Sequence, residues 1–254
     1  LELARDEDLI SSPDDQPHDW TGELMFSPEQ TSTAQIVLRQ PGTISGLEFV
    51  PDILKVFVRD TEFISWTLHT KDGQWSSSGT VLGTLVGSSI ALVRLERTLL
   101  NLVSRLSGIA TRTQEFVDLV EGTQADICDT RKTTPGLRMF EKYAVRCGGG
   151  VSHRIGLYDA LLVKDNHLAN LGESEFKERV LSASTKAREQ QLSFVQVEVD
   201  SLIQLDWILS MKPGICDIVL LDNMPPEMLA TAVRQKNKSN PTLKLEASGG
   251  ITQA

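Results

Sequence analysis

The chain has 254 residues, of which 40% are hydrophobic and 23% are charged, and its formal net charge is −9. These values are ordinary for a soluble globular protein and leave room for one large domain or two smaller ones. Because no excess of Lys and Arg is available to pair with phosphates, the charge argues against a general nucleic-acid binder or a membrane-surface protein.

The cysteines and the most apolar stretch exclude two further classes of protein. Cys128, Cys147 and Cys216 are widely separated and no C-x-x-C pair occurs, so the pattern indicates neither a disulfide framework nor a zinc knuckle. We expect reduced thiols in a cytoplasmic protein, with Cys128 and Cys147 as small core residues. Residues 81–93 are interrupted by glycine, serine and threonine, so this stretch is too short and too polar to span a bilayer.

The first ~85 residues predict a small α+β domain, because short strand-like runs alternate with turn residues. The runs are residues 35–38, 54–58 and 63–68, after an acidic, turn-like segment at 6–19 whose residues 6–15 are expected to form a solvated face or loop. From Ser89 the leucines fall at spacings of three and four, which predicts an amphipathic helix. Gly108 interrupts the pattern, and a second helical stretch is expected to reach about Val120.

The remainder of the chain alternates between strand-like and helix-like patterns. Apolar strand-like runs occur at residues 125–128, 160–163, 194–199, 217–221 and 243–247. Amphipathic segments lie between some of them, for example at 173–190 and 226–236. This alternation predicts the βα units of a parallel sheet.

Charged, polar or glycine residues follow each of these predicted strands. The groups are Asp129 to Lys132, Lys164 to His167, Glu198 with Asp200, Asp222 with Asn223, and Ser248 to Gly250. In a parallel βα barrel the carboxyl ends of the strands converge on one face, where such folds place their chemistry. Their joint occurrence therefore predicts a functional site at that face.

Basic residues are concentrated between positions 130 and 165 of this acidic chain. The segment contains Arg131, Lys132, Arg138, Lys142, Arg146, Arg154 and Lys164, opposed by Glu141, Asp159 and Asp165. A local basic region favours an anionic small ligand. Arg131 and Arg154 suit carboxylates or phosphates, because a guanidinium offers a planar fork of donors. Arg138, Lys142 and Arg146 are four residues apart and are expected to mark the solvated face of a helix.

Glu198 and Asp222 indicate an acidic subsite, where carboxylates could hold ribose hydroxyls or Mg²⁺. The alternative is that they form ion pairs with Lys164 or Lys132, and both interpretations stay open. Ser248-Gly249-Gly250 resembles a phosphate cradle, in which backbone N–H groups approach an anion, although it is also an ordinary turn.

Two histidines and a glycine run complete the candidate set. Gly148-Gly149-Gly150 directly precedes Ser152-His153-Arg154 and fits no nucleotide-binding fingerprint. The spacing of His153 and His167 matches no common zinc motif. We expect a hydrogen-bonding role for His153, and a capping or loop-orienting role for His167.

Several of these segments together resemble the quinolinate phosphoribosyltransferase family, also called nicotinate-nucleotide pyrophosphorylase (carboxylating). The matching text is ERTLLNLVSRLSGIATRT at 96–113, DTRKTTPGLR at 129–138, GGGVSHR at 148–154, LVKDNH at 162–167, Glu198, LDN at 221–223 and LEASGGI at 245–251. The likeness runs from about Asp19 to the end, and DTRKT, GGGxxHR and KDNH in that order are highly specific.

The resemblance implies an α/β fold with two domains. An open α/β sandwich that forms dimers would occupy residues 1–107. An incomplete parallel α/β barrel of the type II phosphoribosyltransferase kind would occupy residues 108–254. Family members continue past the SGGI motif through further strands and a glycine-containing phosphate loop. We therefore expect a barrel truncated at its C-terminus that binds quinolinate better than it turns it over.

The resemblance also implies a role for each matching position. The two carboxylates of quinolinate would be clamped by Arg131, His153, Arg154 and Lys164. Arg97 would reach the same site from the neighbouring subunit of a homodimer or of a higher oligomer built from dimers. The phosphoribosyl donor and its Mg²⁺ would be held by Lys132, Glu198 and Asp222, with the metal bound directly or through substrate and water. The 5′-phosphate would be bound by Ser248, Gly249 and Gly250, and the catalytic set would be Lys132, Lys164, Glu198 and Asp222.

The activity implied is transfer of phosphoribosyl from phosphoribosyl pyrophosphate to quinolinate with decarboxylation, a step of de novo NAD biosynthesis. The products would be nicotinate mononucleotide, pyrophosphate and carbon dioxide. Two alternatives stay open: a related type II phosphoribosyltransferase that uses another ring acid, and a non-catalytic carboxylate-binding paralogue. The surplus of Arg and Lys favours a dicarboxylate over a monocarboxylate.

Overall fold

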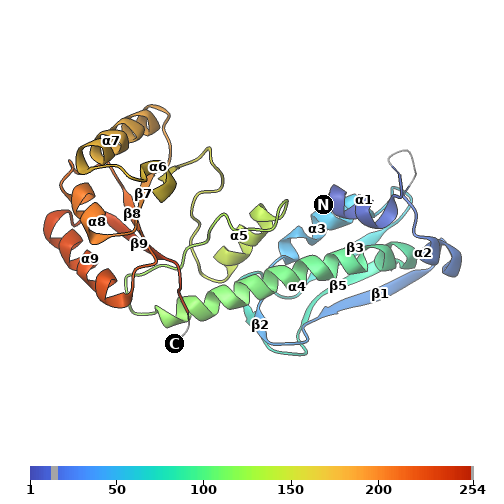
Figure 1. Cartoon of the computed structure of the whole chain (residues 1–254). Coiled ribbons are helices and arrows are strands. Elements are labelled where there is room, and N and C mark those ends of the chain that lie inside the picture. The colour runs from blue at the N-terminus through green and yellow to red at the C-terminus, as the bar shows by residue number, and fades with distance from the viewer. Residues whose placement is uncertain (13–16, 253–254) are drawn as a thin grey trace. The chain divides into compact units, whose positions relative to one another are not determined.

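The computed structural model describes residues 1–12 and 17–252 and divides into two compact units, Leu1–His153 and Arg154–Ala254 (Figure 1). The domain boundary predicted at residues 107 and 108 falls inside a continuous helix and stays a prediction. No helix among the described residues is long and apolar enough to cross a membrane.

The first unit combines two antiparallel sheets with helices. Strands β1 (Thr31–Val37), β5 (Val81–Ser88) and β3 (Ile64–Leu68) form one sheet in the order β1-β5-β3, and β2 (Gly42–Thr43) pairs with β4 (Trp75–Ser76). The helices are α1 (Glu2–Leu9), α2 (Trp20–Met25), the 3₁₀ turn η1 (Leu47–Phe49), α3 (Val50–Phe57), α4 (Ser89–Leu119) and α5 (Arg138–Cys147).

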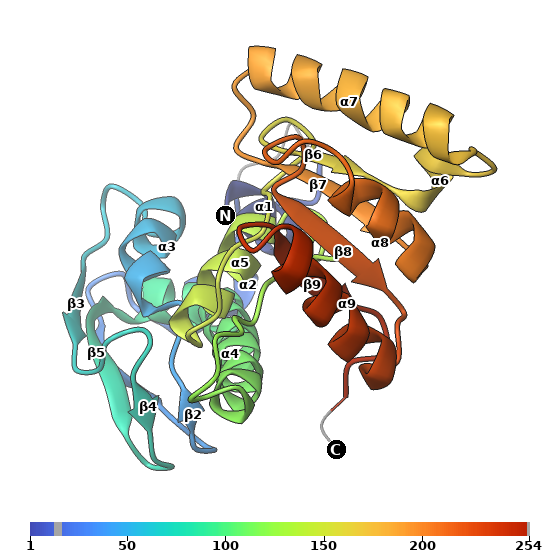
Figure 2. The same cartoon turned by 90° about the vertical axis from the view of Figure 1, so that its left-hand side faces the viewer.

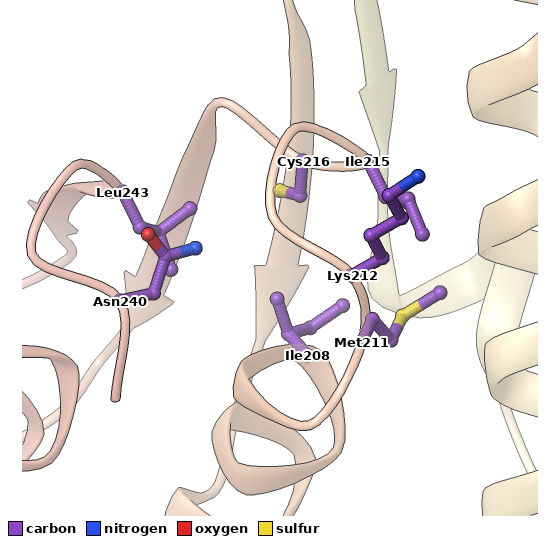
Figure 3. A pocket seen from close by; sticks show the side chains of 7 residues that line it. All are labelled: Ile208, Met211, Lys212, Ile215, Cys216, Asn240 and Leu243. Atoms are coloured by element: carbon purple, nitrogen blue, oxygen red, sulfur yellow. The ribbon is translucent and has the colours of Figure 1, made fainter.

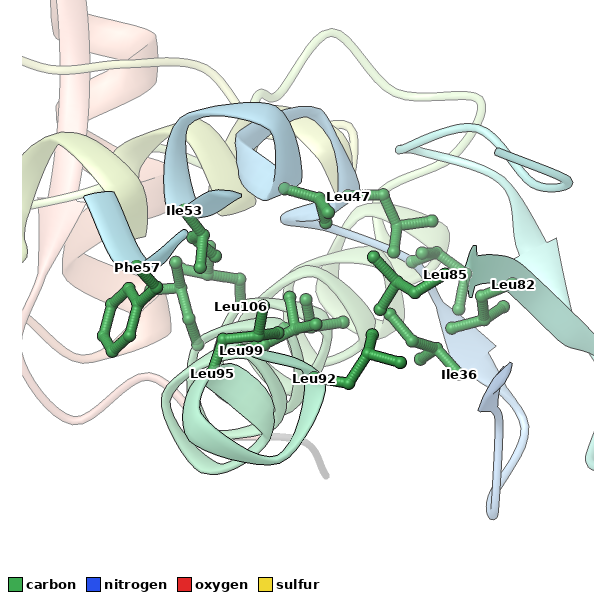
Figure 4. Packing of buried hydrophobic residues seen from close by; sticks show 14 of the residues in the cluster. Ile36, Leu47, Ile53, Phe57, Leu82, Leu85, Leu92, Leu95, Leu99 and Leu106 are labelled. Atoms are coloured by element: carbon green, nitrogen blue, oxygen red, sulfur yellow. The ribbon is translucent and has the colours of Figure 1, made fainter. Parts of the chain in front are cut away.

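Helix α4 organises the core of the first unit. The Ser88 hydroxyl accepts a hydrogen bond from Ala91 N and caps its first turn. Its buried leucines then recur at helical spacing and pack against α3 and against the inner face of the sheet (Figure 4). The cluster contains Ile36, Leu47, Ile53, Phe57, Leu82, Leu85, Leu92, Leu95, Leu99 and Leu106.

Three expectations for the first unit are wrong. Residues 54–58 do not form a strand, because residues 54–57 are the last part of helix α3. This helix has a proline in its first turn, and it buries Val50, Ile53 and Phe57 on one side. Gly108 does not interrupt the long helix, and α4 continues through it. One glycine lowers helix stability by about 1 kcal/mol relative to alanine, which is small beside the free energy gained by burying the leucines of α4. Residues 125–128 form no strand and contribute one bridge, Cys128 to Val151.

The acidic N-terminal segment is only partly turn-like. Residues 6–9 belong to α1 rather than to a loop. Residues 13–16 of the predicted acidic face lie outside the described residues.

The second unit is a parallel βα arrangement. Its strands are β6 (Leu161–Val163), β7 (Val195–Val199), β8 (Ile218–Asp222) and β9 (Lys244–Ser248), hydrogen-bonded in that order. The helices are α6 (Asp165–Leu168), α7 (Glu173–Glu189), α8 (Leu202–Leu209) and α9 (Pro226–Ser239) (Figure 2). The predictions of strands at 160–163, 194–199, 217–221 and 243–247 and of helices at 173–190 and 226–236 are confirmed within a few residues.

Helices α7, α8 and α9 pack against one face of this sheet. The shared core includes Phe176 and Val180 from α7 and Leu205 from α8, packed against strand residues such as Val197 and Val219. Burying these apolar side chains supplies the main stabilisation of the unit. The predicted α/β fold class is confirmed, with a sheet-and-helix unit followed by parallel strands of the kind found in an incomplete α/β barrel.

Candidate functional site

The polar residues at the strand ends of the second unit share one face of the parallel sheet. Asp222 of β8 lies opposite Ser248 of β9, and Glu198 of β7 lies opposite Leu220 of β8. Side chains alternate along a strand, and the core with the helices contains Val197, Val199, Val219 and Leu221. Glu198, Asp222 and Ser248 therefore point to the opposite face, at the carboxyl ends of neighbouring strands.

Glu198 is largely buried and faces a lysine. Its side chain is 10% exposed, and its Oε2 lies 3.9 Å from Nζ of Lys164, which follows β6. Burial raises the pKa of the Glu198 carboxyl, Lys164 opposes that rise, and Asp222 and Asp165 add to it. Of the two ion pairs considered from the sequence, the structure shows the one with Lys164. The two carboxylates, Glu198 and Asp222, form an acidic subsite beside one cation.

The corner after β8 and β9 is held by Asn223. Its Nδ2 donates to Asp222 Oδ2 at 2.7 Å, and its backbone N donates to Ser248 O at 2.8 Å. Gly249 has φ +86°, and a Cβ there would stand 2.0 Å from Asn223 Oδ1. Glycine is therefore required at 249 both by its backbone conformation and by the close approach of Asn223. This contact gives Asn223 of the LDN motif a structural task that the sequence did not reveal.

Sequence reasoning missed one polar pair on the same face. Gln196 is fully buried in β7, and its Nε2 donates to Glu246 Oε2 at 2.9 Å. Both residues lie two positions before a predicted site residue, Glu198 and Ser248 respectively. Because alternate residues of a strand share a face, this spacing was the available signal.

His167 caps the short helix α6, as predicted. Its Nδ1 accepts a hydrogen bond from Lys164 N at 2.8 Å, so in this arrangement the ring proton is assigned to Nε2. Arg154 is buried, and its Nη1 donates to Ala160 O at 3.5 Å. The carboxylate of Asp159 accepts from Ile155 N and Gly156 N, both at 2.8 Å, and closes the turn that follows Arg154.

The remaining predicted residues lie in the first unit. The segments 127–129 and 151–153 run side by side, joined by Asp129 N to Val151 O at 3.1 Å and Val151 N to Ile127 O at 2.8 Å. Arg131 follows the first segment and His153 ends the second. Arg131 Nε is buried and has no acceptor within residues 1–12 and 17–252, so it is a donor suited to an added anion.

Lys132 and Arg97 are exposed, Arg97 on the outer side of α4. Within the first unit, the structure joins the segment that precedes Arg131 to the segment that ends at His153.

One prediction for the basic segment is wrong. Lys142 of α5 is not on a solvated helix face: its side chain is 4% exposed and pairs with Asp129, whose side chain is also 4% exposed. The neighbouring Glu141 accepts from Arg105 Nε at 2.8 Å and from Thr134 N at 3.1 Å. Burial opposes ionisation of Glu141, but these hydrogen bonds outweigh it and lower its pKa.

The Gly148-Gly149-Gly150 run ends α5 and packs it against α4. Gly150 N donates to Val145 O and Gly149 N donates to Arg146 O, both at 3.0 Å, with Gly149 at φ +85°. This is the left-handed helix ending that favours glycine. A Cβ at Gly148 would stand 2.3 Å from Ala110 O of α4. The run therefore positions the following segment and shows no feature of a phosphate loop.

A small cavity of about 10 Å³ lies at the other end of the parallel strands (Figure 3). It is lined by Ile208, Met211, Lys212, Ile215, Cys216, Asn240 and Leu243, which surround the amino ends of β8 and β9. A space of this size holds about one water molecule, so it is no substrate site.

The three cysteines form no disulfide bond with one another in the described part of the chain. Cys216 is buried, and burial raises the pKa of its thiol to about 12. Cys128 and Cys147 are half-buried, so the expectation that they are core residues is wrong. Burial also raises the pKa of Cys147.

Comparison with known proteins gives a consistent result. Residues 19–107 match the family described as quinolinate phosphoribosyl transferase, N-terminal domain, and residues 109–254 match its C-terminal domain. The chain is 42% identical over 235 residues to a probable nicotinate-nucleotide pyrophosphorylase [carboxylating] of Bacillus subtilis, covering 92% of this chain and 76% of that protein. It is 43% identical over 221 residues to the nicotinate-nucleotide pyrophosphorylase [carboxylating] of Mycobacterium leprae, covering 87% of this chain and 74% of that one.

Solved structures agree with the sequence matches. The crystal structure of NadC from Streptococcus pyogenes superposes with a TM-score of 0.83 at 31% identity, covering 99% of this chain and 82% of that chain. The nicotinate-nucleotide pyrophosphorylase from Francisella tularensis superposes with a TM-score of 0.82 at 33% identity, with the same coverage of 99% and 82%. With both family domains matched and relatives above 40% identity, this chain belongs to the quinolinate phosphoribosyltransferase family.

Proposed function

We propose that this chain transfers the phosphoribosyl group of phosphoribosyl pyrophosphate to quinolinate and decarboxylates the product, a reaction of NAD biosynthesis. The products are nicotinate mononucleotide, pyrophosphate and carbon dioxide. The observation that carries the proposal is the acidic subsite of Glu198 and Asp222 beside Lys164, at the carboxyl ends of parallel strands. Family membership and the names of the relatives support the same activity.

Quinolinate is bound in this proposal by Arg131, His153, Arg154 and Lys164. The buried, unpaired Nε of Arg131 supports its assignment, because a buried donor without an acceptor is unfavourable until an anion supplies one. Guanidinium groups also match the planar geometry of a carboxylate. Two carboxylates on adjacent ring carbons account for a set of several cations where a monocarboxylate would need fewer.

Lys132, Glu198 and Asp222 hold the phosphoribosyl donor with Mg²⁺, and Ser248, Gly249 and Gly250 bind its 5′-phosphate. Two carboxylates suit Mg²⁺, which is commonly bound through one or two protein carboxylates together with substrate phosphates and water. Glu198 and Asp222 supply that set, and no larger cluster of metal-binding side chains occurs in residues 1–12 and 17–252. When bound, the metal neutralises charge on the leaving pyrophosphate. The positive φ angles of Gly249 and Gly250, +86° and +67°, let backbone N–H groups approach an anion.

The chemistry proceeds in two steps. The pyridine nitrogen forms a bond to the anomeric carbon of the donor as the bond from that carbon to pyrophosphate breaks. Positive charge develops on the ribose, and the carboxylates of Glu198 and Asp222 stabilise it electrostatically. The pyridinium then accepts the electron pair of the breaking bond at ring carbon 2, carbon dioxide leaves, and a proton takes its place. The chain's main contribution is orientation of the two substrates, which lowers the barrier by up to roughly 7–11 kcal/mol.

The oligomer and the compartment are part of the proposal. Arg97 is exposed on α4, and we assign it to the site of a partner subunit in a homodimer. This assignment rests on the motif at residues 96–113. Cysteines that form no disulfide bond are compatible with a cytoplasmic protein.

The test is incubation with quinolinate, phosphoribosyl pyrophosphate and Mg²⁺, following carbon dioxide and pyrophosphate together. We expect equal amounts of both products, formed about 10²–10³-fold more slowly by the Glu198→Gln variant. Turnover of nicotinate but not of quinolinate would instead support the paralogue that uses another ring acid. Quinolinate binding without either product would support the non-catalytic paralogue.

A further inference from the structure

A buried ion pair in the first unit, Lys142 with Asp129, has no role in the proposed binding set. Each side chain is 4% exposed. Buried pairs of this kind contribute little net stability, because removing two charges from water offsets most of their attraction. The role of this ion pair is therefore indicated by the groups that it contacts rather than by its contribution to stability.

Both members of the pair bind the backbone of His153. Asp129 Oδ1, the oxygen that pairs with Lys142, accepts a hydrogen bond from His153 N at 2.9 Å. Lys142 Nζ donates to His153 O at 3.2 Å. The two polar backbone groups of a single residue are thus held by opposite charges, and this sets the direction in which the His153 side chain leaves the chain.

The same pair also fixes the segment that contains Arg131. Asp129 stands two residues before Arg131, and its own backbone N is bonded to Val151 O at 3.1 Å. Through its main chain and its side chain, Asp129 therefore joins the segment of Arg131 to the segment of His153.

Lys142 is held firmly because the residues beside it anchor α5. Glu141 accepts from Thr134 N at 3.1 Å and from Arg105. Tyr143 donates its hydroxyl to Asp72 Oδ2 at 2.9 Å, and Asp72 in turn accepts from Leu47 N at 3.0 Å. Three consecutive residues of α5 thus connect the two candidate binding segments to the rest of the unit.

We propose that the Lys142–Asp129 ion pair is a positioning element that sets His153 and Arg131 in register for the carboxylates of the substrate. The inference rests on the proposed function, and both residues act through others without touching the substrate. Arg94–Glu62 is a second buried pair of the first unit, with side chains 1% and 12% exposed. Its side-chain contacts are to Phe57 O, to Arg59 N and within the pair, away from the two candidate binding segments.

The experiment compares Lys142→Met with Arg94→Met, since each leaves one buried carboxylate without its partner. Calorimetric titration gives the dissociation constants for quinolinate and for nicotinate below the unfolding temperature of every variant. Lys142→Met should weaken quinolinate binding by about 10-fold or more, the usual effect of losing a hydrogen bond to a charged group, and reduce the preference for quinolinate over nicotinate. Arg94→Met should lower the melting temperature but leave both the affinity and the preference unchanged.

A milder variant covers the case in which Lys142→Met does not fold. Asp129→Asn keeps an acceptor for His153 N while removing the charge that holds Lys142, and it should shift the quinolinate preference in the same direction by a smaller factor. An unchanged preference in either folded variant, or an equal change in Arg94→Met, overturns the positioning role. Failure of the unmodified chain to bind quinolinate overturns the proposed function itself, so the two failures are distinguishable.

Discussion

Substitution of Gly249 by alanine tests how the end of β9 shapes the acidic subsite. Gly249 has φ +86°, and an added Cβ would stand 2.0 Å from Asn223 Oδ1. The Asn223 side chain must then move and release its 2.7 Å hydrogen bond to Asp222 Oδ2. Gly250 is the matched control, because it also has positive φ, +67°, but a Cβ there meets nothing within 4 Å.

Two terms set the expected magnitude. A residue with a Cβ in the left-handed region loses roughly 1–2 kcal/mol, and this loss applies to both glycines. Loss of the exposed Asn223–Asp222 hydrogen bond adds about 1 kcal/mol at position 249 alone. We therefore expect Gly249→Ala to lower the free energy of unfolding by roughly 2–3 kcal/mol and Gly250→Ala by roughly 1–2 kcal/mol. Since Asp222 is proposed to hold the donor, the apparent KM for phosphoribosyl pyrophosphate should rise more in Gly249→Ala.

Urea unfolding of the three proteins and their donor saturation curves provide the measurements. The double variant Asn223→Ala with Gly249→Ala removes the clash between the two side chains. Its loss of unfolding free energy should therefore not exceed the sum of the losses in the two single variants. Equal losses of stability in Gly249→Ala and Gly250→Ala would refute the reasoning, because backbone strain alone would then explain both. A donor KM unaffected in Gly249→Ala would separate Asn223 from the function of Asp222.

Three further predictions concern other parts of the chain. Glu198→Gln should reduce turnover by about 10²–10³-fold, and thermal unfolding should show it at least as stable as the unmodified chain at pH 7. Burial raises the pKa of Glu198 in the folded state above its value in the unfolded state. The folded protein with protonated Glu198 is therefore favoured at low pH, and this stability is lost as the pH rises through the folded-state pKa. The Glu198→Gln substitution should consequently stabilise the protein more at pH 7 than at pH 4. Gly108→Ala should raise the free energy of unfolding by about 0.5–1 kcal/mol, as measured in urea titrations. Gly108 is exposed within α4, and a Cβ at this position meets nothing within 4 Å. If the substitution instead destabilises the protein, the helix is broken at Gly108. Mixing Arg97→Ala with Lys164→Met protein should restore part of the activity if subunits share sites, whereas verified subunit exchange without rescue would exclude Arg97 from a partner's site.

The parallel strands of the second unit were predictable because their pattern is local. Each is a short apolar run bounded by polar or turn residues, as expected for a strand covered by helices. The segment at 54–58 failed for the opposite reason. Its β-branched and aromatic residues favour a strand locally, but the longer spacing of Val50, Ile53 and Phe57 places one apolar side against α4, and tertiary packing decides the outcome.

The burial of Lys142 could not be predicted from its own helix. Spacing by four residues identifies a side of a helix, but it does not say whether that side meets water or another segment. Lysine is buried when a carboxylate from elsewhere in the chain reaches it, and the carboxylate here is Asp129, outside α5. Such a pairing is a property of the folded chain, and a single sequence contains no local trace of it.

Strands carry more information about the direction of a side chain than helices do, and this explains which site residues were found. Once one face of a parallel sheet is covered by helices, that face must be apolar, so any polar residue inside a strand points to the other face. In β7, with the sequence VQVEV, the valines occupy the core, and both Gln196 and Glu198 must share the opposite face. The alternation of side chains therefore identifies Gln196 together with Glu198, and the hydrogen bond from Gln196 to Glu246 at 2.9 Å extends the polar face one step back along the strands from the acidic subsite.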